Sequence, residues 1–250
     1  MTLSKRIALV TGSSSGIGRG VALAFAAAGA EVVVNYPTAA EAAAAAAVVD
    51  EITALGRRAV AVCADVSDEA AVRALVAAAM AAFGRIDILV NNAGIAAAGA
   101  VHELDVAVWD RVIAVHLRGT FLMTRAVLPQ MYARGQGRII NTVSQLAYKG
   151  APGFAAYTAA KGGILSFTRS TALEIGARDI TINCVAPGAT NTPILADVPA
   201  AILEQIRQAI PLGRFAEVAD IAPTYVFLAT EGARHYQGQC LSPNGGDVFL

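Results

Sequence analysis

One stretch near the N-terminus is the strongest indicator of the fold: Ile7-Ala8-Leu9-Val10-Thr11-Gly12-Ser13-Ser14-Ser15-Gly16-Ile17-Gly18. Its apolar beginning leads into a glycine-rich turn, and an alanine-rich apolar segment follows as far as Ala28. This order predicts a buried strand, a tight turn and a helix that starts within the turn. Backbone N–H groups at such a helix start bind anions, and glycines let a pyrophosphate approach them closely. The spacing G-x-x-x-G-x-G also fits an ordinary strand-to-helix connection, so the turn alone leaves both interpretations open.

Outside this stretch, short segments rich in Val and Ile alternate with longer helical patterns. The apolar run at 86–91 is typical of a parallel strand that is covered on both faces. We expect strands at 6–11, 31–36, 58–63, 86–91, 137–144, 180–186 and 239–242. We expect helices at 16–28, 39–55, 68–83, 105–134, 154–178 and 216–230, and a variable segment at 189–212. The alternation predicts an α/β fold, a doubly wound parallel sheet of about seven strands with helices on both faces, in a single domain over 1–250.

The composition describes a globular chain without an obvious charged partner. Its 250 residues are 56% hydrophobic and carry 19 basic and 19 acidic side chains, which gives a formal net charge of zero. Such a chain can bury a large core, and nothing in its charge indicates nucleic acid or an anionic membrane surface as a partner. Cys63, Cys184 and Cys240 lie far apart without metal-ligand spacing, so we expect reduced core thiols, no metal site and a cytoplasmic location. We also expect no signal peptide, because the first six residues lead directly into the first strand.

Tyr157 and Lys161 stand four residues apart in the helix expected at 154–178, downstream of Ser144. Side chains at i and i+4 share one face of a helix, so the Lys161 ammonium can lie near the Tyr157 phenol. A neighbouring cation favours the phenolate, and we expect it to lower the pKa of Tyr157 toward the value that acid–base exchange with an alcohol and ketone pair requires. Ser144 would then hold the substrate oxygen. The alternative is a half-buried tyrosine beside a solvated lysine.

Further polar and glycine motifs fall where the expected strands end. They are Asp65-Val66, Asn91-Asn92-Ala93-Gly94 and Pro187-Gly188. Taken singly, each can be an ordinary turn or helix cap. In a doubly wound sheet, however, ligands bind beyond the carboxyl ends of the strands, where these motifs would meet the glycine turn and Ser144. Their common placement favours a nucleotide-binding site at that edge.

With these motifs, the whole chain resembles the short-chain dehydrogenase/reductase family. The resemblance implies a Rossmann-type fold, an NAD(P)-dependent enzyme, and hydride transfer between the nicotinamide and a secondary alcohol or ketone. It implies catalytic roles for Ser144, Tyr157 and Lys161, with Tyr157 exchanging the proton and Lys161 also binding the nicotinamide ribose. The residues that we expect to bind the coenzyme are Gly12, Ser14, Gly16, Ile17, Gly18, Asn35, Tyr36, Asp65, Val66, Asn91, Ala93, Gly94, Tyr157, Lys161, Pro187, Gly188 and Thr192.

One position departs from the family pattern. His116 stands where most relatives carry an asparagine that joins a water-linked proton relay to the lysine. One hypothesis is a catalytic relay role, with an ionisation between about pH 6 and 7 in the pH–rate profile. The alternative is a histidine that only packs beneath the site.

The coenzyme preference depends on the residues at the end of the second strand, Val34-Asn35-Tyr36-Pro37-Thr38. A carboxylate at this place selects NAD by binding the ribose hydroxyls, whereas basic residues accommodate the 2′-phosphate of NADP. This segment has neither, and Arg19 lies one turn into the first helix. We therefore expect NADP, with NAD as the alternative.

The order and spacing of the motifs resemble bacterial 3-oxoacyl-[acyl-carrier-protein] reductases, and Pro187–Ile194 also resembles bacterial glucose dehydrogenases. We expect a 3-oxoacyl substrate under an apolar mobile lid near 189–212. A sugar, polyol or cyclic alcohol is the alternative small-molecule substrate, and a catalytically silent nucleotide-binding regulatory protein is the alternative of another class. No basic patch for a carrier protein is evident in the sequence, although Arg125, Arg134 and Arg138 could cluster near the long helix.

The resemblance also implies a homotetramer. An apolar tail, Val248-Phe249-Leu250, ends the chain, and exposed to water it would be unusual on a monomer. Small residues on the helix at 154–178 would allow close helix packing; they are Ala155, Ala156, Ala159, Gly162 and Gly163.

Overall fold

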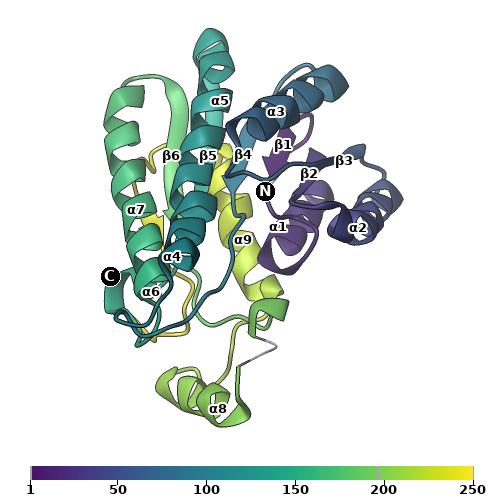
Figure 1. Cartoon of the computed structure of the whole chain (residues 1–250). Coiled ribbons are helices and arrows are strands. Elements are labelled where there is room, and N and C mark those ends of the chain that lie inside the picture. Colours follow the sequence, from purple (N-terminus) through teal and green to yellow (C-terminus); the bar gives the residue numbers. More distant parts are fainter. Residues whose placement is uncertain (1, 196–197, 250) are drawn as a thin grey trace.

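Figure 1 shows the computed structural model of the chain, which describes residues 2–195 and 198–249. Within these residues, seven parallel strands form one sheet in the order β3-β2-β1-β4-β5-β6-β7. The strands are β1 Ile7–Val10, β2 Glu31–Tyr36, β3 Ala59–Cys63, β4 Ile88–Asn91, β5 Gln136–Thr142, β6 Asp179–Val185 and β7 Cys240–Leu241.

The helices pack on both faces of this sheet, except for α8, which stands away from the layered body (Figure 1). They are α1 Gly16–Ala27, α2 Ala42–Ala54, α3 Glu69–Phe83, α4 Val106–Ile113, α5 Gly119–Arg134, α6 Leu146–Lys149, α7 Ala155–Ile175, α8 Ala200–Ala209 and α9 Val218–Ala229. None of the helices in the described part of the chain is long and apolar enough to cross a bilayer.

The core explains why the strands are apolar on both faces. In β1, Ala8 and Val10 belong to the cluster formed with α1, α2 and α9, whereas Leu9 belongs to the cluster formed with α3, α5 and α7. Successive side chains of a strand point to opposite faces, so a strand with two covered faces must be apolar throughout. The predicted doubly wound α/β fold is confirmed, and the predicted strands lie within a few residues of the observed ones.

Three helical features differ from the prediction. The single helix expected at 105–134 is divided by a π-helical segment, Ala114–Arg118, and the short helix α6 was not expected. The variable segment at 189–212 contains a 3₁₀ turn, Pro193–Leu195, and α8; residues 196–197 of this predicted lid lie outside the described residues. A π-helical segment has no strong sequence signature, and such segments are frequent at functional sites.

Strand order places the binding edge. From the pair β1 and β4, the strand order proceeds outward to both edges of the parallel sheet, to β3 on one side and to β7 on the other. The connections therefore leave this pair on opposite faces and open a crevice at its carboxyl end. The glycine turn follows β1 and the loop Asn92–Gly94 follows β4. The two segments that the sequence singled out therefore meet at this crevice.

Candidate active site

The loop after β4 is held against the glycine turn by hydrogen bonds from both sides. Thr11 Oγ1 accepts from the backbone nitrogens of Asn92 and Ala93, at 2.9 and 3.0 Å. Asn92 Nδ2 in turn donates to the backbone oxygens of Thr11 and Gly12, at 3.0 and 3.1 Å. Ala93 and the turn thus form one rigid floor for the crevice.

Each of the three turn glycines has its own physical reason. A Cβ on Gly18 would lie 2.2 Å from the Gly12 oxygen, and a Cβ on Gly12 would lie 2.8 Å from the Ala93 Cα. Gly16 has φ +55°, and the nearest atoms to a Cβ there belong to Thr192, at 3.7 Å. Gly12 and Gly18 are required by close packing, whereas Gly16 is favoured by its positive φ, which L side chains rarely adopt.

The start of α1 offers hydrogen-bond donors to a ligand at the turn. Its N-cap residue, Ser15, makes no side-chain cap, so the first-turn N–H groups of Gly16, Ile17 and Gly18 are left for another acceptor. The helix dipole adds a favourable potential for an anion. The turn therefore fits the pyrophosphate of a dinucleotide, which would be held by these backbone groups.

Asn35 fixes the glycine turn to the end of β2. Its Oδ1 accepts from the Gly12 nitrogen at 3.2 Å, and its Nδ2 donates to the Ala64 oxygen at 3.0 Å and the Val62 oxygen at 3.3 Å. The side chain is 1% exposed, so its polar atoms are used inside the protein. Asn35 thus connects the glycine turn to the end of β3, and its side chain does not face the ligand.

Asn35→Asp should therefore destabilise the protein and not act mainly on coenzyme choice. A carboxylate cannot donate to the Ala64 and Val62 oxygens, and it would stand buried among acceptors, so we expect a loss of about 2–4 kcal/mol in the free energy of unfolding. Urea unfolding measures this loss. Asn92→Asp makes the same change at a less buried position and should lower the free energy of unfolding by less. Equal losses in the two variants would contradict the connecting role of Asn35.

The end of β3 leads into a second ordered turn at the carboxyl edge of the sheet. Asp65 accepts hydrogen bonds from Ser67 and forms an ion pair with Arg111 at 2.8 Å. Partial burial would raise the pKa of Asp65, but the bonds from Ser67 and Arg111 outweigh it and hold this pKa below its usual value. Val66 is buried beside this turn, and the Tyr36 oxygen accepts from the Ala64 nitrogen at 2.8 Å. These contacts show a well-ordered turn, with the Asp65 carboxylate occupied by protein partners.

Ser144, Tyr157 and Lys161 come together at the ends of β5 and α7. Lys161 is 3% exposed; its Nζ donates to the Thr142 oxygen at 2.7 Å and lies 5.6 Å from the centre of the Tyr157 ring. Ser144 is buried, and its Oγ accepts from the Leu146 nitrogen at 3.2 Å. The i,i+4 spacing therefore places the ammonium beside the ring, as expected.

The pKa values in this group differ from the expectation. Burial raises the pKa of Tyr157, with a hydrogen bond from Ser144 acting the other way, and burial lowers the pKa of Lys161 to about 7. The predicted lowering of the Tyr157 pKa by Lys161 is wrong, because the ammonium faces the Thr142 oxygen and the ring rather than the phenol oxygen. A phenol with a raised pKa is protonated at neutral pH, which is the form that gives a proton to a carbonyl.

His116 lies in the π-helical segment, beneath the site. Its ring packs edge-on against Tyr157 with the centroids 5.2 Å apart, and its Nε2 lies 3.0 Å from the Ile95 nitrogen and 2.8 Å from the Ile95 oxygen. Its Nδ1 is buried without a hydrogen-bond partner in the described part of the chain. Burial, and then the charge of Lys161, lowers the pKa of His116 to about 3. The expected His116 ionisation near pH 6–7 is therefore wrong, since the ring is neutral across that range.

The remaining predicted residues lie in close-packed segments at the carboxyl ends of β4 and β6. Asn91 points inward, with Nδ2 donating to Asn141 Oδ1 at 2.8 Å. Gly94 lies against His116, where a Cβ would come within 2.4 Å of the ring. The Pro187 oxygen accepts from the Gln145 nitrogen, and a Cβ on Gly188 would lie 2.7 Å from the Asn244 Cα. The turn at 187–188 is thus close-packed beside Ser144.

One set of contacts near the site, made by Asp247, was not indicated by the sequence. Asp247 accepts from Gln145 Nε2 at 2.6 Å and from Lys149 Nζ at 2.6 Å, with its side chain 5% exposed. It joins the chain beyond β7 to the loop that carries Ser144. Asp247 is distant in sequence, and no residue spacing pairs it with Gln145.

The chain is similar over almost its full length to known oxidoreductases. A family model described as Enoyl-(Acyl carrier protein) reductase matches residues 12–247. The (2S)-[(R)-hydroxy(phenyl)methyl]succinyl-CoA dehydrogenase subunit BbsD of Thauera aromatica is 44% identical over 246 residues, 98% of each chain. A 3-oxoacyl-[acyl-carrier-protein] reductase of Synechocystis sp. is 44% identical over 249 residues, 99% of each chain. A solved putative short-chain alcohol dehydrogenase from Sinorhizobium meliloti has a TM-score of 0.92 at 36% identity, covering 98% of this chain and 97% of that one.

Proposed function

The chain belongs to the short-chain dehydrogenase/reductase family, and from this premise we propose that it interconverts a ketone and a secondary alcohol with a nicotinamide dinucleotide as coenzyme. The observation that carries the proposal is the meeting of Ser144, Tyr157 and Lys161 beside the glycine turn, at the carboxyl edge of the sheet. When bound, the dinucleotide supplies or accepts the hydride. The turn backbone at Gly16–Gly18 would hold its pyrophosphate.

The protein's own residues would handle the proton and the substrate oxygen. Tyr157 gives its phenol proton to the carbonyl oxygen during reduction, and Ser144 holds that oxygen by a hydrogen bond. Lys161 would bind the nicotinamide ribose, and its ammonium, which faces the Thr142 oxygen in this structure, would have to turn toward the phenol to favour the phenolate that is left behind. His116 contributes a neutral imidazole whose buried Nδ1 has no hydrogen-bond partner among residues 2–195 and 198–249, and we propose that it holds a relay water near Lys161.

The pH–rate profile separates Lys161 from His116. Since the pKa of Lys161 is about 7, its ammonium is present below that pH and lost above it, so carbonyl reduction should decline as the pH rises through about 7. His116→Asn should keep this decline and retain activity within about tenfold, roughly 1.4 kcal/mol in the barrier. His116→Leu should lose more, because it removes every side-chain polar group. A decline that disappears in His116→Asn would assign it to the histidine instead, and equal rates in Asn and Leu variants would leave His116 a packing residue only.

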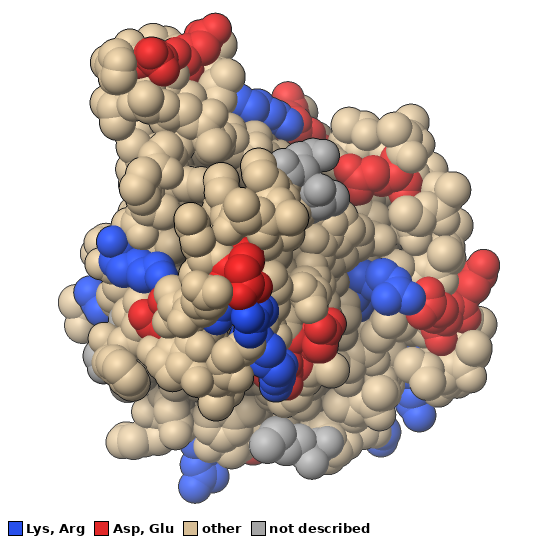
Figure 2. Space-filling view, turned by 90° about the horizontal axis from the view of Figure 1, so that it is seen from below, with Lys and Arg blue, Asp and Glu red and all other residues tan. Residues whose placement is uncertain are grey.

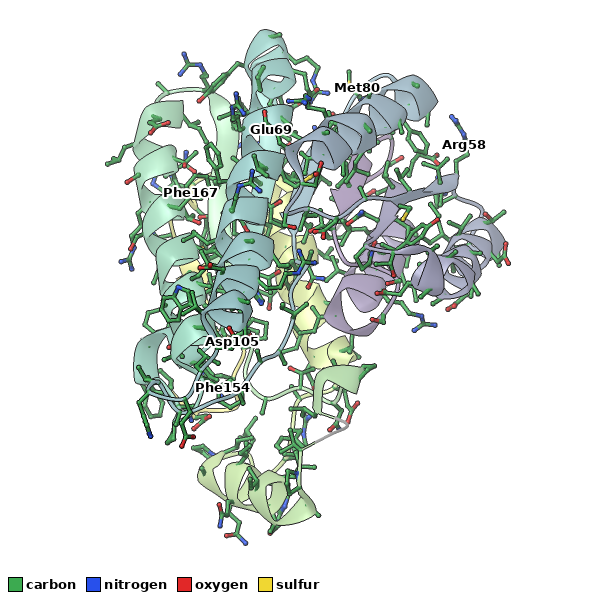
Figure 3. The ribbon with its side chains drawn as sticks, in the orientation of Figure 1. Arg58, Glu69, Met80, Asp105, Phe154 and Phe167 are labelled. Atoms are coloured by element: carbon green, nitrogen blue, oxygen red, sulfur yellow. The ribbon has the colours of Figure 1, made fainter. Side chains whose placement is uncertain are left out.

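We propose a 3-oxoacyl thioester as the substrate. Two similar proteins are named for acyl groups carried by coenzyme A or by acyl carrier protein, and both carriers form thioesters. Phe154, whose ring lies edge-on to Tyr157 with the centroids 6.3 Å apart, offers an apolar wall. Figure 3 shows Phe154 at the end of the molecule where α8 lies. We propose that the segment 189–212, with α8 and its half-exposed Ile202, closes over the acyl chain.

Coenzyme oxidation with a panel of ketones tests this function. We expect a 3-oxoacyl-CoA to be reduced faster than glucose-type and cyclic substrates at equal concentration. Faster turnover of a sugar, polyol or cyclic ketone would favour the alternative substrate class. Dinucleotide binding with no turnover of any ketone or alcohol would favour a silent regulatory protein.

The charged surface does not single out a carrier-protein contact. Figure 2 shows basic and acidic residues interspersed on the face seen from below. The expected cluster of Arg125, Arg134 and Arg138 is not formed as a free basic patch, because these side chains pair with Glu69, Asp87 and Asp179 respectively. Arg138 is moreover buried. A free coenzyme A thioester is therefore the first substrate to test.

The coenzyme choice is the finer part of the proposal. The prediction of NADP depended on the absence of an acid in the segment 34–38, and the structure adds an acid from outside that segment, because the Glu41 carboxylate accepts a hydrogen bond from Ser14 in the glycine turn. The choice between NAD and NADP therefore depends on what Glu41 does to the adenosine ribose.

We propose a homotetramer. Leu173 on α7 is 84% exposed and Phe249 is 90% exposed, and apolar side chains this exposed are typical of covered surfaces. Of the small residues on α7, Ala159 is exposed, whereas Ala156 is buried and Gly163 packs on Leu117. Leu250, the last residue of the predicted tail, lies outside the described residues. Light scattering should give about four times the 25.6 kDa chain mass, and a mass near 25.6 kDa at micromolar concentration would contradict the tetramer.

We also propose a cytoplasmic location, supported by the three cysteines, which are free thiols in the structure. They are not all core residues as expected. Cys63 is exposed on the edge strand β3, whereas Cys184 is buried.

A further inference from the structure

The carboxylate of Glu41 stands at the adenosine end of the proposed dinucleotide site. After β2, a 3₁₀ turn at Ala39–Glu41 leads the chain back toward the glycine turn. There Ser14 Oγ donates to Glu41 Oε2 at 2.5 Å, and Ser14 is only 4% exposed. Glu41 therefore brings a negative charge to the turn itself.

The position of Ser14 places this charge near the ribose. The turn is joined to the end of β2 by the bond from the Gly12 nitrogen to Asn35 Oδ1 and by the bond from the Ser13 nitrogen to the Asn35 oxygen, at 2.9 Å. In a doubly wound dinucleotide site, the adenosine ribose lies over the end of this second strand, where an acid about 20 residues after the glycine turn can bind its 2′-hydroxyl. Glu41 follows the turn at a comparable distance along the chain.

The cation that the sequence placed nearby is engaged elsewhere. Arg19 Nη2 donates to both carboxylate oxygens of Glu51, at 2.8 and 2.6 Å, on the neighbouring helix α2. A phosphate at the turn would therefore have to draw Arg19 away from Glu51 before the guanidinium could neutralise it. The net charge close to Ser14 is thus negative, which favours a neutral ribose hydroxyl over a phosphate at this place.

We propose that Glu41 selects NAD over NADP in this protein. Its carboxylate keeps one acceptor oxygen for the Ser14 hydroxyl and offers the other to the ribose 2′-hydroxyl. A 2′-phosphate would place a second anion beside the carboxylate and would have to displace it from Ser14. This inference rests on the proposed function, since it requires that the glycine turn binds a dinucleotide.

Fluorescence titration of NADH and NADPH against the purified protein tests the inference without measuring turnover. Wild type should bind NADH at least tenfold more tightly than NADPH, and the preference should shrink at high salt, because it is electrostatic. Glu41→Gln keeps the shape and removes the charge, and it should narrow the preference by about tenfold, mainly through tighter NADPH binding.

Asp50→Asn is the matched control. Asp50 is an exposed acid on α2, the helix that follows the 3₁₀ turn of Glu41, so this variant makes the same change in net charge away from Ser14 and should keep the wild-type preference. A second variant, Glu51→Gln, frees Arg19 and should improve NADPH binding while Glu41 stays in place. Thermal unfolding of each variant checks that it is folded.

Two results would overturn the role of Glu41 alone. One is wild-type protein that binds NADPH as tightly as NADH. The other is a preference for NADH that does not depend on Glu41, because Glu41→Gln leaves it unchanged or because Asp50→Asn changes it as much as Glu41→Gln does. Failure of wild type to bind either dinucleotide would refute the proposed function together with this inference.

Discussion

Tyr157→Phe should lower the turnover of a ketone by about 10³-fold or more while coenzyme binding stays close to that of wild type. The variant keeps the ring that packs against His116 and Phe154, so the site keeps its shape. It removes only the hydroxyl whose proton goes to the substrate oxygen. Steady-state reduction of a non-activated 3-oxoacyl-CoA, together with a coenzyme titration, measures both quantities.

Tyr132→Phe is the control for this experiment. Tyr132 lies partly exposed on α5, where its ring stacks under Arg178, and loss of its hydroxyl should leave turnover unchanged. Near-normal turnover by Tyr157→Phe would refute the proposed proton donor. A variant that also fails to bind coenzyme would show that the phenol serves binding rather than proton transfer.

Lys161→Met should lower turnover by about 10²-fold or more and should also weaken coenzyme binding. The ammonium has two proposed tasks, on the phenol and on the nicotinamide ribose, and Met supplies neither charge nor donor. Met has a similar length, so the core around this 3% exposed side chain should remain filled.

The same variant should be more stable than wild type near neutral pH. The folded-state pKa of Lys161 is about 7, against 10.5 for the ordinary group, so the unfolded chain holds more protons between these values. Burial of the ammonium therefore costs stability in full below pH 7, and the cost falls as the pH rises from 7 toward 10.5. We expect Lys161→Met to gain on the order of a few kcal/mol at pH 7 and less as the pH rises.

Urea unfolding at several pH values measures this difference. Lys5→Met removes an exposed lysine and should give no pH-dependent gain over the same range. A Lys161→Met variant that is less stable than wild type at pH 7 would contradict the buried, desolvated ammonium. A site that loses stability to hold a catalytic group is a common compromise between stability and activity.

Local patterns in the sequence predicted most of the fold. The β4 run Ile88-Leu89-Val90 is apolar because both faces of the sheet are covered, and this constraint is visible in the sequence itself. The glycine turn and the pair Tyr157 and Lys161 lie as expected for another reason, since spacing within one turn or one helix determines how they lie, whereas Ser144 was placed by its position after the strand β5. The π-helical segment was missed because it needs no special residue, only one extra residue in the turn.

Long-range contacts and burial could not be predicted in this way. Glu41 lies just beyond the segment at 34–38 that the sequence pointed to, and only the 3₁₀ turn returns it to Ser14. The direction of the Tyr157 pKa shift depends on the depth of burial and on the direction of the Lys161 ammonium, and i,i+4 spacing gives neither. For His116, the sequence identified the unusual residue, but burial and the charge of Lys161, which keep the ring neutral, could not be predicted.

The strand order has a consequence for synthesis on the ribosome. The half-sheet β3-β2-β1-β4 is contiguous in the first part of the chain, and each later strand joins beside the previous one. The helix α9, which packs on α1 and completes that face, comes only at Val218–Ala229. Until then the nascent chain carries an open sheet edge and an uncovered apolar face, so we expect it to be most prone to aggregation before α9 emerges.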